Sequence, residues 1–459
     1  MTKSLPATHK GFSRRSILLA TGGSMALVAC GHKNSKPILV GKRADVFSSG
    51  AGLMVDQDDH TPITIPAPVI DSKWMQEGRV PSHTSIHSAI GGVRKRWDCS
   101  IGSGNSEPSP LAFMALGSKG RGIVSTTPVV DGERFFTVDA VGKVTAFDWK
   151  TKKVLWKLNP NKKGSKSSNL GGGIGLTDDA LYVVDGVAQT LRVDRNTGNV
   201  VWRIDVGTPG RSAPTIVDER VYFGTIDGSL FCLDSKTGNQ IWSYQTGSVQ
   251  TKLFGQPAPA YFDGIIVAGF GTGDLVALRA ETGEQIWTET LGRSGRDSDT
   301  DFSAISALPV IVDGTVYAIS VGSVLVAIDV RSGRRLWERE AAGQNAMVVI
   351  SDWLFALSLD QQLACLDRVT GRVRWVTQLR RFKNEEKSKD PIAWYGPVLG
   401  GGQLICISDF GDNGLVTIDP ATGKVTKVVK TDITPALAPV IVNENLLVLG
   451  QNGKLTAFG

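Results

Sequence analysis

The sequence predicts an all-β protein, an eight-bladed β-propeller of four-stranded antiparallel blades whose ring is closed by pairing an N-terminal strand with the C-terminal blade. Three observations support this fold. From residue 128 onward, a segment containing Asp-x-x-Thr-Gly-x-x-x-Trp recurs at a period of propeller length. Each copy holds runs rich in β-branched and aromatic residues that are separated by turn residues. No long stretch beyond the N-terminus has the 3.6-residue periodicity of a helix.

The repeat places one tryptophan in each copy, at successive separations of 46, 40, 45, 50 and 38 residues. In residues 221–234 two β-rich runs flank an Asp227-Gly228 turn, and the following Thr-Gly step turns the chain into the strand that carries the tryptophan. One Asp and one Trp per blade indicate a turn and a core position, so we expect the tryptophans to be structural. They are Trp156, Trp202, Trp242, Trp287, Trp337 and Trp375, with Trp97 in the strand that closes the ring.

The first and seventh copies depart from the repeat at its glycine and its tryptophan, and the last copy is incomplete. Lys152 replaces the glycine in the first copy, and Lys427 replaces the tryptophan in the seventh. Residues 439–459 supply three strands, and we expect the fourth to come from residues 93–98. Such closure hides the edges of the ring, which would otherwise invite strand addition. Eight blades over residues 74–459 result. Seven blades remain the alternative if the segment after Trp375 forms no blade of its own.

Length and composition agree with one large repeat domain. The chain has 459 residues, of which 41% are apolar, and this fraction is too high for a disordered protein. No run outside the N-terminus approaches the ~20 apolar residues of a membrane-spanning helix. The net charge is +6, but residues 1–29 carry four basic residues and no acidic one, which leaves +2 for the rest. This balance gives no basic surface for nucleic acid.

Residues 1–29 have the features of a bacterial lipoprotein signal peptide. A basic region containing Arg14 and Arg15 precedes a short apolar stretch that begins at Ile17. The arginine pair resembles a twin-arginine export signal, and an ordinary Sec signal is the alternative.

Leu27-Val28-Ala29-Cys30 resembles a lipobox, in which Cys30 carries the lipid and becomes the first mature residue. Residues 30–73 would then form a lipidated N-terminal linker. Gly31, rather than Asp, follows the cysteine, which in lipoproteins implies the periplasmic face of the outer membrane.

The sequence predicts no catalytic residue, no metal site and no cofactor. The remaining cysteines form no Cys-x-x-Cys pair, and two of them, Cys232 and Cys365, lie in apolar strand segments as small buried residues. Asp297–Asp301 resembles the start of a calcium loop but lacks the required Gly and Glu at later positions. Gly171–Gly173 is not followed by the Lys-Ser/Thr of a phosphate loop.

The tandem repeats resemble those of the pyrroloquinoline-quinone (PQQ) dehydrogenase type, found in quinoprotein enzymes and in non-enzymatic relatives. With its lipobox, its polar leader and its length, the chain is similar to the BamB family, lipoproteins of the outer-membrane β-barrel assembly machinery. Trp74-Met75-Gln76-Glu77-Gly78 also resembles the Trp-x-Gln-x-Gly opening of alphaproteobacterial relatives. The resemblance covers nearly all of residues 74–459.

This resemblance implies a non-enzymatic scaffold that assists the folding and insertion of β-barrel proteins. Its implied partner is the barrel-assembly pore protein BamA, bound through its periplasmic POTRA domains, and nascent β-barrel proteins are further candidates. Two alternatives remain open. One is a PQQ-dependent quinoprotein dehydrogenase-like enzyme, although the vicinal cysteine pair of the alcohol dehydrogenases is absent. The other is a generic periplasmic protein-interaction propeller.

In the BamB family the partner docks on two neighbouring loops, one with a Leu-x-Leu-Arg-Gly-like stretch and one acidic. The matching stretch here contains Thr251, Leu253 and Phe254, of which Leu253 matches while Thr251 and Phe254 depart from the pattern. Asp299 and Asp301 supply the acidic pair, displaced relative to the family spacing. The resemblance therefore implies a docking site at these five residues.

Overall fold

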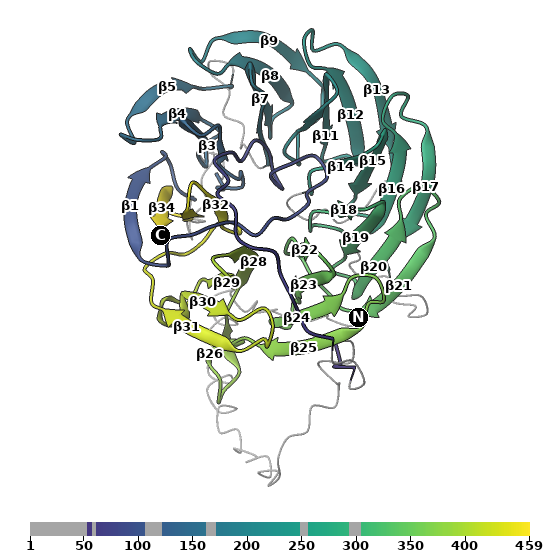
Figure 1. The fold of residues 1–459 in the computed structure, drawn as a ribbon. Coiled ribbons are helices and arrows are strands. Elements are labelled where there is room, and N and C mark those ends of the chain that lie inside the picture. Colours follow the sequence, from purple (N-terminus) through teal and green to yellow (C-terminus); the bar gives the residue numbers. More distant parts are fainter. Residues whose placement is uncertain (1–52, 57–60, 106–121, 162–170, 248–255, 293–303) are drawn as a thin grey trace, which may run out of the picture. The chain divides into compact units, whose positions relative to one another are not determined.

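The computed structural model describes residues 53–56, 61–105, 122–161, 171–247, 256–292 and 304–459, all within one compact unit that spans residues 50–459. Apart from a single 3-10 turn, η1 (Gly411–Asn413), the regular structure of these residues is β-strand. Eight four-stranded antiparallel sheets are arranged as a propeller ring (Figure 1). The predicted fold class is confirmed, with eight blades rather than seven.

The first four blades each consist of four consecutive strands. Their strands are β2 (Val129–Val130), β3 (Arg134–Val138), β4 (Val144–Asp148) and β5 (Val154–Leu158) in blade 1; β6 (Gly172–Leu176), β7 (Ala180–Asp185), β8 (Gln189–Asp194) and β9 (Val200–Asp205) in blade 2; β10 (Thr215–Val217), β11 (Arg220–Gly224), β12 (Ser229–Asp234) and β13 (Gln240–Gln245) in blade 3; and β14 (Ala260–Phe262), β15 (Ile265–Gly269), β16 (Asp274–Arg279) and β17 (Gln285–Thr290) in blade 4.

Blades 5 to 7 repeat this order, and blade 8 joins the two ends of the ring. Their strands are β18 (Val310–Val312), β19 (Thr315–Ile319), β20 (Val324–Asp329) and β21 (Arg335–Glu340) in blade 5; β22 (Val348–Ile350), β23 (Trp353–Leu357), β24 (Gln362–Asp367) and β25 (Val373–Gln378) in blade 6; β28 (Trp394–Gly400), β29 (Gln403–Ser408), β30 (Leu415–Ile418) and β31 (Val425–Val429) in blade 7; and β32 (Val440–Val442), β33 (Asn445–Leu449), β34 (Lys454–Phe458) and β1 (Lys95–Ser100) in blade 8.

The ring closes within blade 8 as the sequence predicts. Strand β1 pairs with β34 in an antiparallel register that places Trp97 opposite Ala457 and Cys99 opposite Leu455. The outermost strand of the last blade therefore comes from the N-terminal side of the chain, and the three inner strands come from the C-terminal end.

Burial follows the position of a strand in its blade. The middle strands are packed between neighbouring blades, so strand β12 is buried at every position except its final Asp234. The outer strand β13 instead alternates between exposed side chains and side chains such as Trp242 that point inward.

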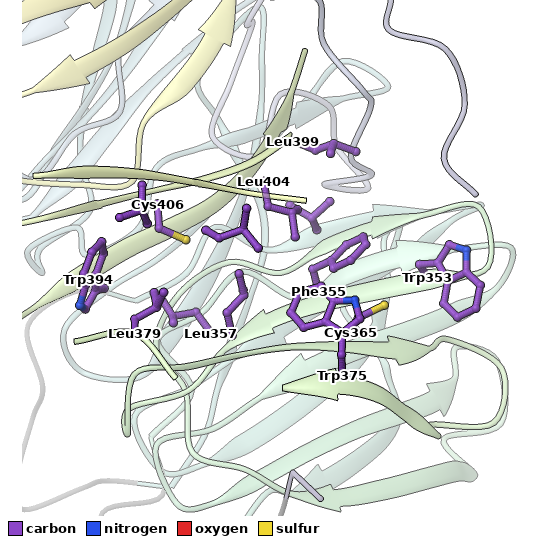
Figure 2. Packing of buried hydrophobic residues seen from close by; sticks show 14 of the residues in the cluster. Trp353, Phe355, Leu357, Cys365, Trp375, Leu379, Trp394, Leu399, Leu404 and Cys406 are labelled. Carbon is purple, nitrogen blue, oxygen red and sulfur yellow. The ribbon is translucent and has the colours of Figure 1, made fainter. Parts of the chain in front are cut away.

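The hydrophobic core is divided into clusters between adjacent blades. Figure 2 shows the cluster between blades 6 and 7, where Phe355 and Trp375 of one blade pack near Leu404 and Cys406 of the next. Cys232 and Cys365 are buried and unbridged, as predicted, and burial raises the pKa of the Cys232 thiol to about 12.

The connection between blades 6 and 7 contains a short exposed hairpin. Its strands β26 (Phe382–Asn384) and β27 (Lys389–Pro391) pair only with each other (Figure 1). The Glu385 carboxylate supports the start of this hairpin by accepting hydrogen bonds from the backbone N–H groups of Arg381 and Phe382.

Candidate functional site

The repeat tryptophans bind each blade to the next one. In six successive blades the indole Nε1–H donates to a backbone carbonyl in the repeat turn of the following blade, at 2.7–3.1 Å. This turn is Asp-x-x-Thr-Gly except in blade 4, where Arg279 replaces the Asp, and in blade 5, where Ser332 replaces the Thr. Trp242, for example, donates to the carbonyl of Ala280 at 3.0 Å and is 8% exposed. Its position at the blade interface supports the structural role that the sequence predicts for these residues.

The turns need glycine at this position because the tryptophan of the preceding blade packs directly against it. Gly283 has a φ of +76°, and a Cβ atom on it would lie 2.7 Å from Cδ2 of Trp242. A side chain there would strain the backbone and displace the indole ring. The Asp of the turn organises the loop, since Oδ1 of Asp234 accepts hydrogen bonds from both the N–H and the hydroxyl of Thr237. These bonds hold the pKa of Asp234 below its ordinary value.

The exceptions at the glycine and tryptophan positions of the repeat have structural explanations. Lys152, at the glycine position of blade 1, has a φ of +61°, and its Nζ lies 4.4 Å from the ring centroid of Trp97 in blade 8. Lys427 lies on the outer strand of blade 7, facing blade 8. That blade has no Asp-x-x-Thr-Gly turn, because its two outermost strands come from opposite ends of the chain. A tryptophan at position 427 would therefore have no turn to contact.

The two faces of the ring differ in the length of their connections. In an antiparallel meander, the first and third turns of a blade lie on one face, and the second turn and the link to the next blade lie on the other. The first face has short turns. The second face has the long connections after strands β1, β5, β13, β17 and β25. Long loops on a rigid scaffold are the usual carriers of binding function, so this connection face is the candidate functional surface.

Residues 71–91, which we call the central strap, make a circuit of the channel and hydrogen-bond to every blade in chain order. Figure 1 shows this segment as the dark trace through the middle of the ring. Its contacts with blades 1 to 8 are Trp74–Val130, Met75–Leu176, Gln76–Ile216, Pro81–Tyr261, Ser82–Ile311, Ser85–Val349, Ser88–Leu399 and Gly91–Glu444. The strap thus occupies hydrogen-bonding groups of the innermost strands, on the face opposite the long connections.

Parts of the predicted linker that precede the strap are also docked on the ring. Leu53 is buried in the cluster of blades 5 and 6, and Asp56 exchanges two hydrogen bonds with the backbone of Val373. Ile63 and Ile65 pack against the cluster between blades 6 and 7. At these four residues the segment contacts the propeller, whereas most of its other described residues are exposed.

A cavity of about 520 Å³ lies in the channel between the strap and the starts of the innermost strands. At the strap end its lining includes Trp74, Glu77 and His83. The lining from the blades comes from residues that precede or begin the inner strands, such as Arg211 and Met347. Because those residues belong to the connection face, the cavity is associated with the same face as the long loops.

Two strap side chains in this cavity have strongly shifted pKa values. Burial raises the pKa of Glu77 to about 7, although backbone N–H groups of Ala213 and Ala258 donate to its carboxylate and act in the opposite direction. Burial lowers the pKa of His83 to about 4. The Nδ1 of His83 bonds to the carbonyl of Pro309 at 2.8 Å, and its buried Nε2 has no partner among the described residues.

The predicted lipidation and docking residues cannot be placed in this geometry. Cys30, Thr251, Leu253, Phe254, Asp299 and Asp301 all lie outside the described residues. The two docking segments follow strands β13 and β17, so they belong to consecutive connections between blades 3 and 4 and blades 4 and 5.

The structure also assigns features that the sequence does not indicate. The Trp-x-Gln-x-Gly motif at 74–78 contains the strap residues that contact blades 1 to 3. Arg211 lines the cavity, and an isolated arginine before a strand carries no sequence signal. Within the described ranges, no group of three potential metal ligands gathers, and no helix has the length and apolarity to cross a membrane.

The repeated inter-blade contacts and the eight-bladed ring define a β-propeller of the PQQ-like repeat class. The profile of the family described as outer membrane protein assembly factor BamB matches residues 142–377 and 348–459. The chain belongs to this family.

Individual relatives are similar over most of their length. The outer membrane protein assembly factor BamB of Yersinia pestis is 25% identical over 430 residues, which cover 92% of this chain and 98% of the relative. That of Burkholderia pseudomallei is 27% identical over 392 residues, covering 83% of this chain and 91% of the relative.

Two solved structures have the same fold. The crystal structure of BamB from Moraxella catarrhalis aligns with a TM-score of 0.65 and 18% identity, covering 80% of this chain and 99% of that one. The quinohemoprotein alcohol dehydrogenase of Comamonas testosteroni aligns with a TM-score of 0.63 and 13% identity, covering 84% and 80%. At these identities the structural likeness concerns the fold alone.

Proposed function

We propose that this protein is the non-enzymatic scaffold subunit of the outer-membrane β-barrel assembly machinery, which assists the folding and insertion of β-barrel proteins. Membership of the BamB family carries the proposal, because the family profile spans residues 142–459 and the Yersinia relative aligns over nearly its whole length. The long loops gathered on one face are consistent with a scaffold that binds partners there.

The protein would act at the periplasmic face of the outer membrane, held by a lipid on Cys30. Acyl chains contribute ~0.8 kcal/mol per buried methylene, so the two or three chains of a lipoprotein anchor it far better than one. The docked residues Leu53 and Asp56 support this arrangement, because they fix the chain that leads from the anchor to the ring.

The docking surface for the POTRA domains of BamA would comprise Thr251, Leu253 and Phe254, with Asp299 and Asp301 on the next connection. Apolar side chains of this kind carry most of the binding energy of a protein interface, whereas charged residues chiefly steer and orient the partner. The first segment belongs to the connection between blades 3 and 4, and the second belongs to the next one, between blades 4 and 5. This proximity in the ring supports placing both segments in one docking surface.

A pull-down with the purified periplasmic domains of BamA tests the proposal. We expect replacing both Leu253 and Phe254 by Ala to weaken capture by ~2 kcal/mol or more, with an unchanged melting curve. Replacing Asp299 and Asp301 by Asn should weaken capture less, and mainly at low salt. Ile241→Ala is the matched control, since Ile241 is an exposed apolar residue of the outer strand of blade 3.

Full capture by the Leu253/Phe254 double variant would move the interface elsewhere, with the β26–β27 hairpin as the next surface to test. Failure of the wild-type protein to co-purify with the assembly complex would contradict the proposed function. The dehydrogenase alternative makes a separate prediction: adding PQQ and Ca²⁺ to the purified protein would produce the absorbance of the bound quinone.

A further inference from the structure

The channel cavity contains one guanidinium that has no acidic partner among the described residues. Arg211 lies in the connection that leads to strand β10 and lines the cavity. Its Nη1 donates to the carbonyl of Gly210 at 2.9 Å, and its buried Nε has no partner. Burial lowers the pKa of Arg211, because the charged group loses hydration that no carboxylate of the described residues replaces.

The other charged groups of the cavity already have partners. Arg79 forms an ion pair with Asp71 at 3.3 Å. The Glu77 carboxylate accepts hydrogen bonds from the backbone of Ala213 and Ala258. Arg211 is therefore the charged group of the lining that is left to bind an anionic group of a ligand.

The rest of the lining is largely apolar, with a few amide side chains. Apolar residues come from several blades and include Val124, Ala213, Pro257, Leu308, Met347 and Val398. Gln256 lies beside the arginine, since its backbone N–H donates to the Arg211 carbonyl at 3.2 Å, and Asn345 lines the cavity as well. A volume of about 520 Å³ is within the range of pockets that enclose small ligands.

We propose that this cavity binds the C-terminal end of a peptide chain with apolar last residues. The terminal carboxylate would pair with Arg211, because a guanidinium presents two parallel donors that match the two oxygens of a carboxylate. The apolar side chains would lie against the lining. The amide nitrogens of Gln256 and Asn345 already donate to the carbonyls of Gly269 and Trp394, at 3.2 and 3.3 Å, so their second N–H groups and their amide oxygens would face the peptide bonds. A simple fatty acid would use the arginine but has no amide groups to pair with them.

The inference goes beyond the proposed function, since it concerns binding by the isolated protein. The probe is an N-acetylated Ala-Val-Phe tripeptide with a free C-terminal carboxylate, titrated calorimetrically into the purified full chain and compared with its C-terminal amide. We expect the acid to bind at least tenfold more tightly than the amide. Arg211→Gln should abolish this difference, while Arg211→Lys should retain part of it. Arg220→Gln, in the same blade but outside the cavity lining, is the matched control and should retain all of it.

Equal affinities of the acid and the amide would overturn the proposal, as would an unchanged preference in Arg211→Gln. Decanoate that binds as tightly as the acid peptide would overturn the assignment to a peptide. Melting curves establish whether each variant is folded. If Arg211→Gln does not fold, the conservative Arg211→Lys variant still tests the proposal. None of these results bears on capture by BamA, so this inference and the proposed function fail separately.

Discussion

Trp242→Ala should destabilise the ring without any direct effect on a binding site. The indole is 8% exposed, lies against Gly283 of blade 4, and has its ring centroid 5.8 Å from that of Tyr222. Truncating a large aromatic side chain in such a position typically costs about 3–5 kcal/mol. The Ala280 carbonyl would keep one hydrogen bond, because the Tyr222 hydroxyl also donates to it at 3.1 Å. The loss should therefore come mainly from packing.

Urea unfolding followed by circular dichroism measures this loss as a lower midpoint with an unchanged slope. Trp242→Phe separates the contributions, because it keeps a ring against the glycine and removes the indole N–H, for an expected cost of about 1–2 kcal/mol. Lys427→Ala is the matched control at the corresponding strand position of blade 7, where the side chain is exposed and faces no such turn. It should change stability by less than about 0.5 kcal/mol. An unchanged midpoint for Trp242→Ala, with lost capture of BamA, would refute the structural assignment.

Three further outcomes can be tested at other positions. Gly283→Ala should cost ~2 kcal/mol or more, whereas Gly264→Ala, which has a similar φ of +79° and no atom within 4 Å, should cost only the backbone strain of about 1 kcal/mol. As pH falls from about 7 to 4.5, Glu77 takes up a proton in the folded state first, and this increases the free energy of unfolding. As pH falls from 6.5 to about 4, His83 takes up a proton in the unfolded state first, and this lowers the free energy of unfolding. The two effects nearly cancel. Glu77→Gln removes the first effect, so the free energy of unfolding should fall by up to ~1.4 kcal/mol per pH unit between pH 6.5 and 4.5, as measured by urea unfolding at each pH. A free energy of unfolding that does not change with pH in this variant would contradict the prediction. Cys30→Ala should leave a folded protein that no longer sediments with membranes after a high-salt wash, and continued sedimentation would show that the lipid is not the main attachment.

The eight blades and their closure are predictable from the sequence because each blade is specified locally. The Asp-x-x-Thr-Gly turn depends on contacts between residues three apart, such as Asp234 and Thr237, and on a glycine that permits positive φ. Such short-range determinants are repeated along the chain, so their period indicates the number of blades. The missing strand of the last copy, together with the early β-rich segment at residues 93–98, indicates how the ring closes.

The partners of these residues are decided only by the tertiary structure. Lys427 is a simple departure from the repeat in the sequence, and its meaning emerges once blade 8 is seen to lack the turn that a tryptophan would contact. The strap is a stronger case, because the Gln76 side chain accepts a hydrogen bond from Ile216, 140 residues away. The strap can follow this path around the channel only because the ring closes and brings residues of every blade to the same axis. The cavity, in which Arg211 has no acidic partner among the described residues, exists for the same reason. No local pattern encodes such contacts, since they depend on the relative position of all eight blades.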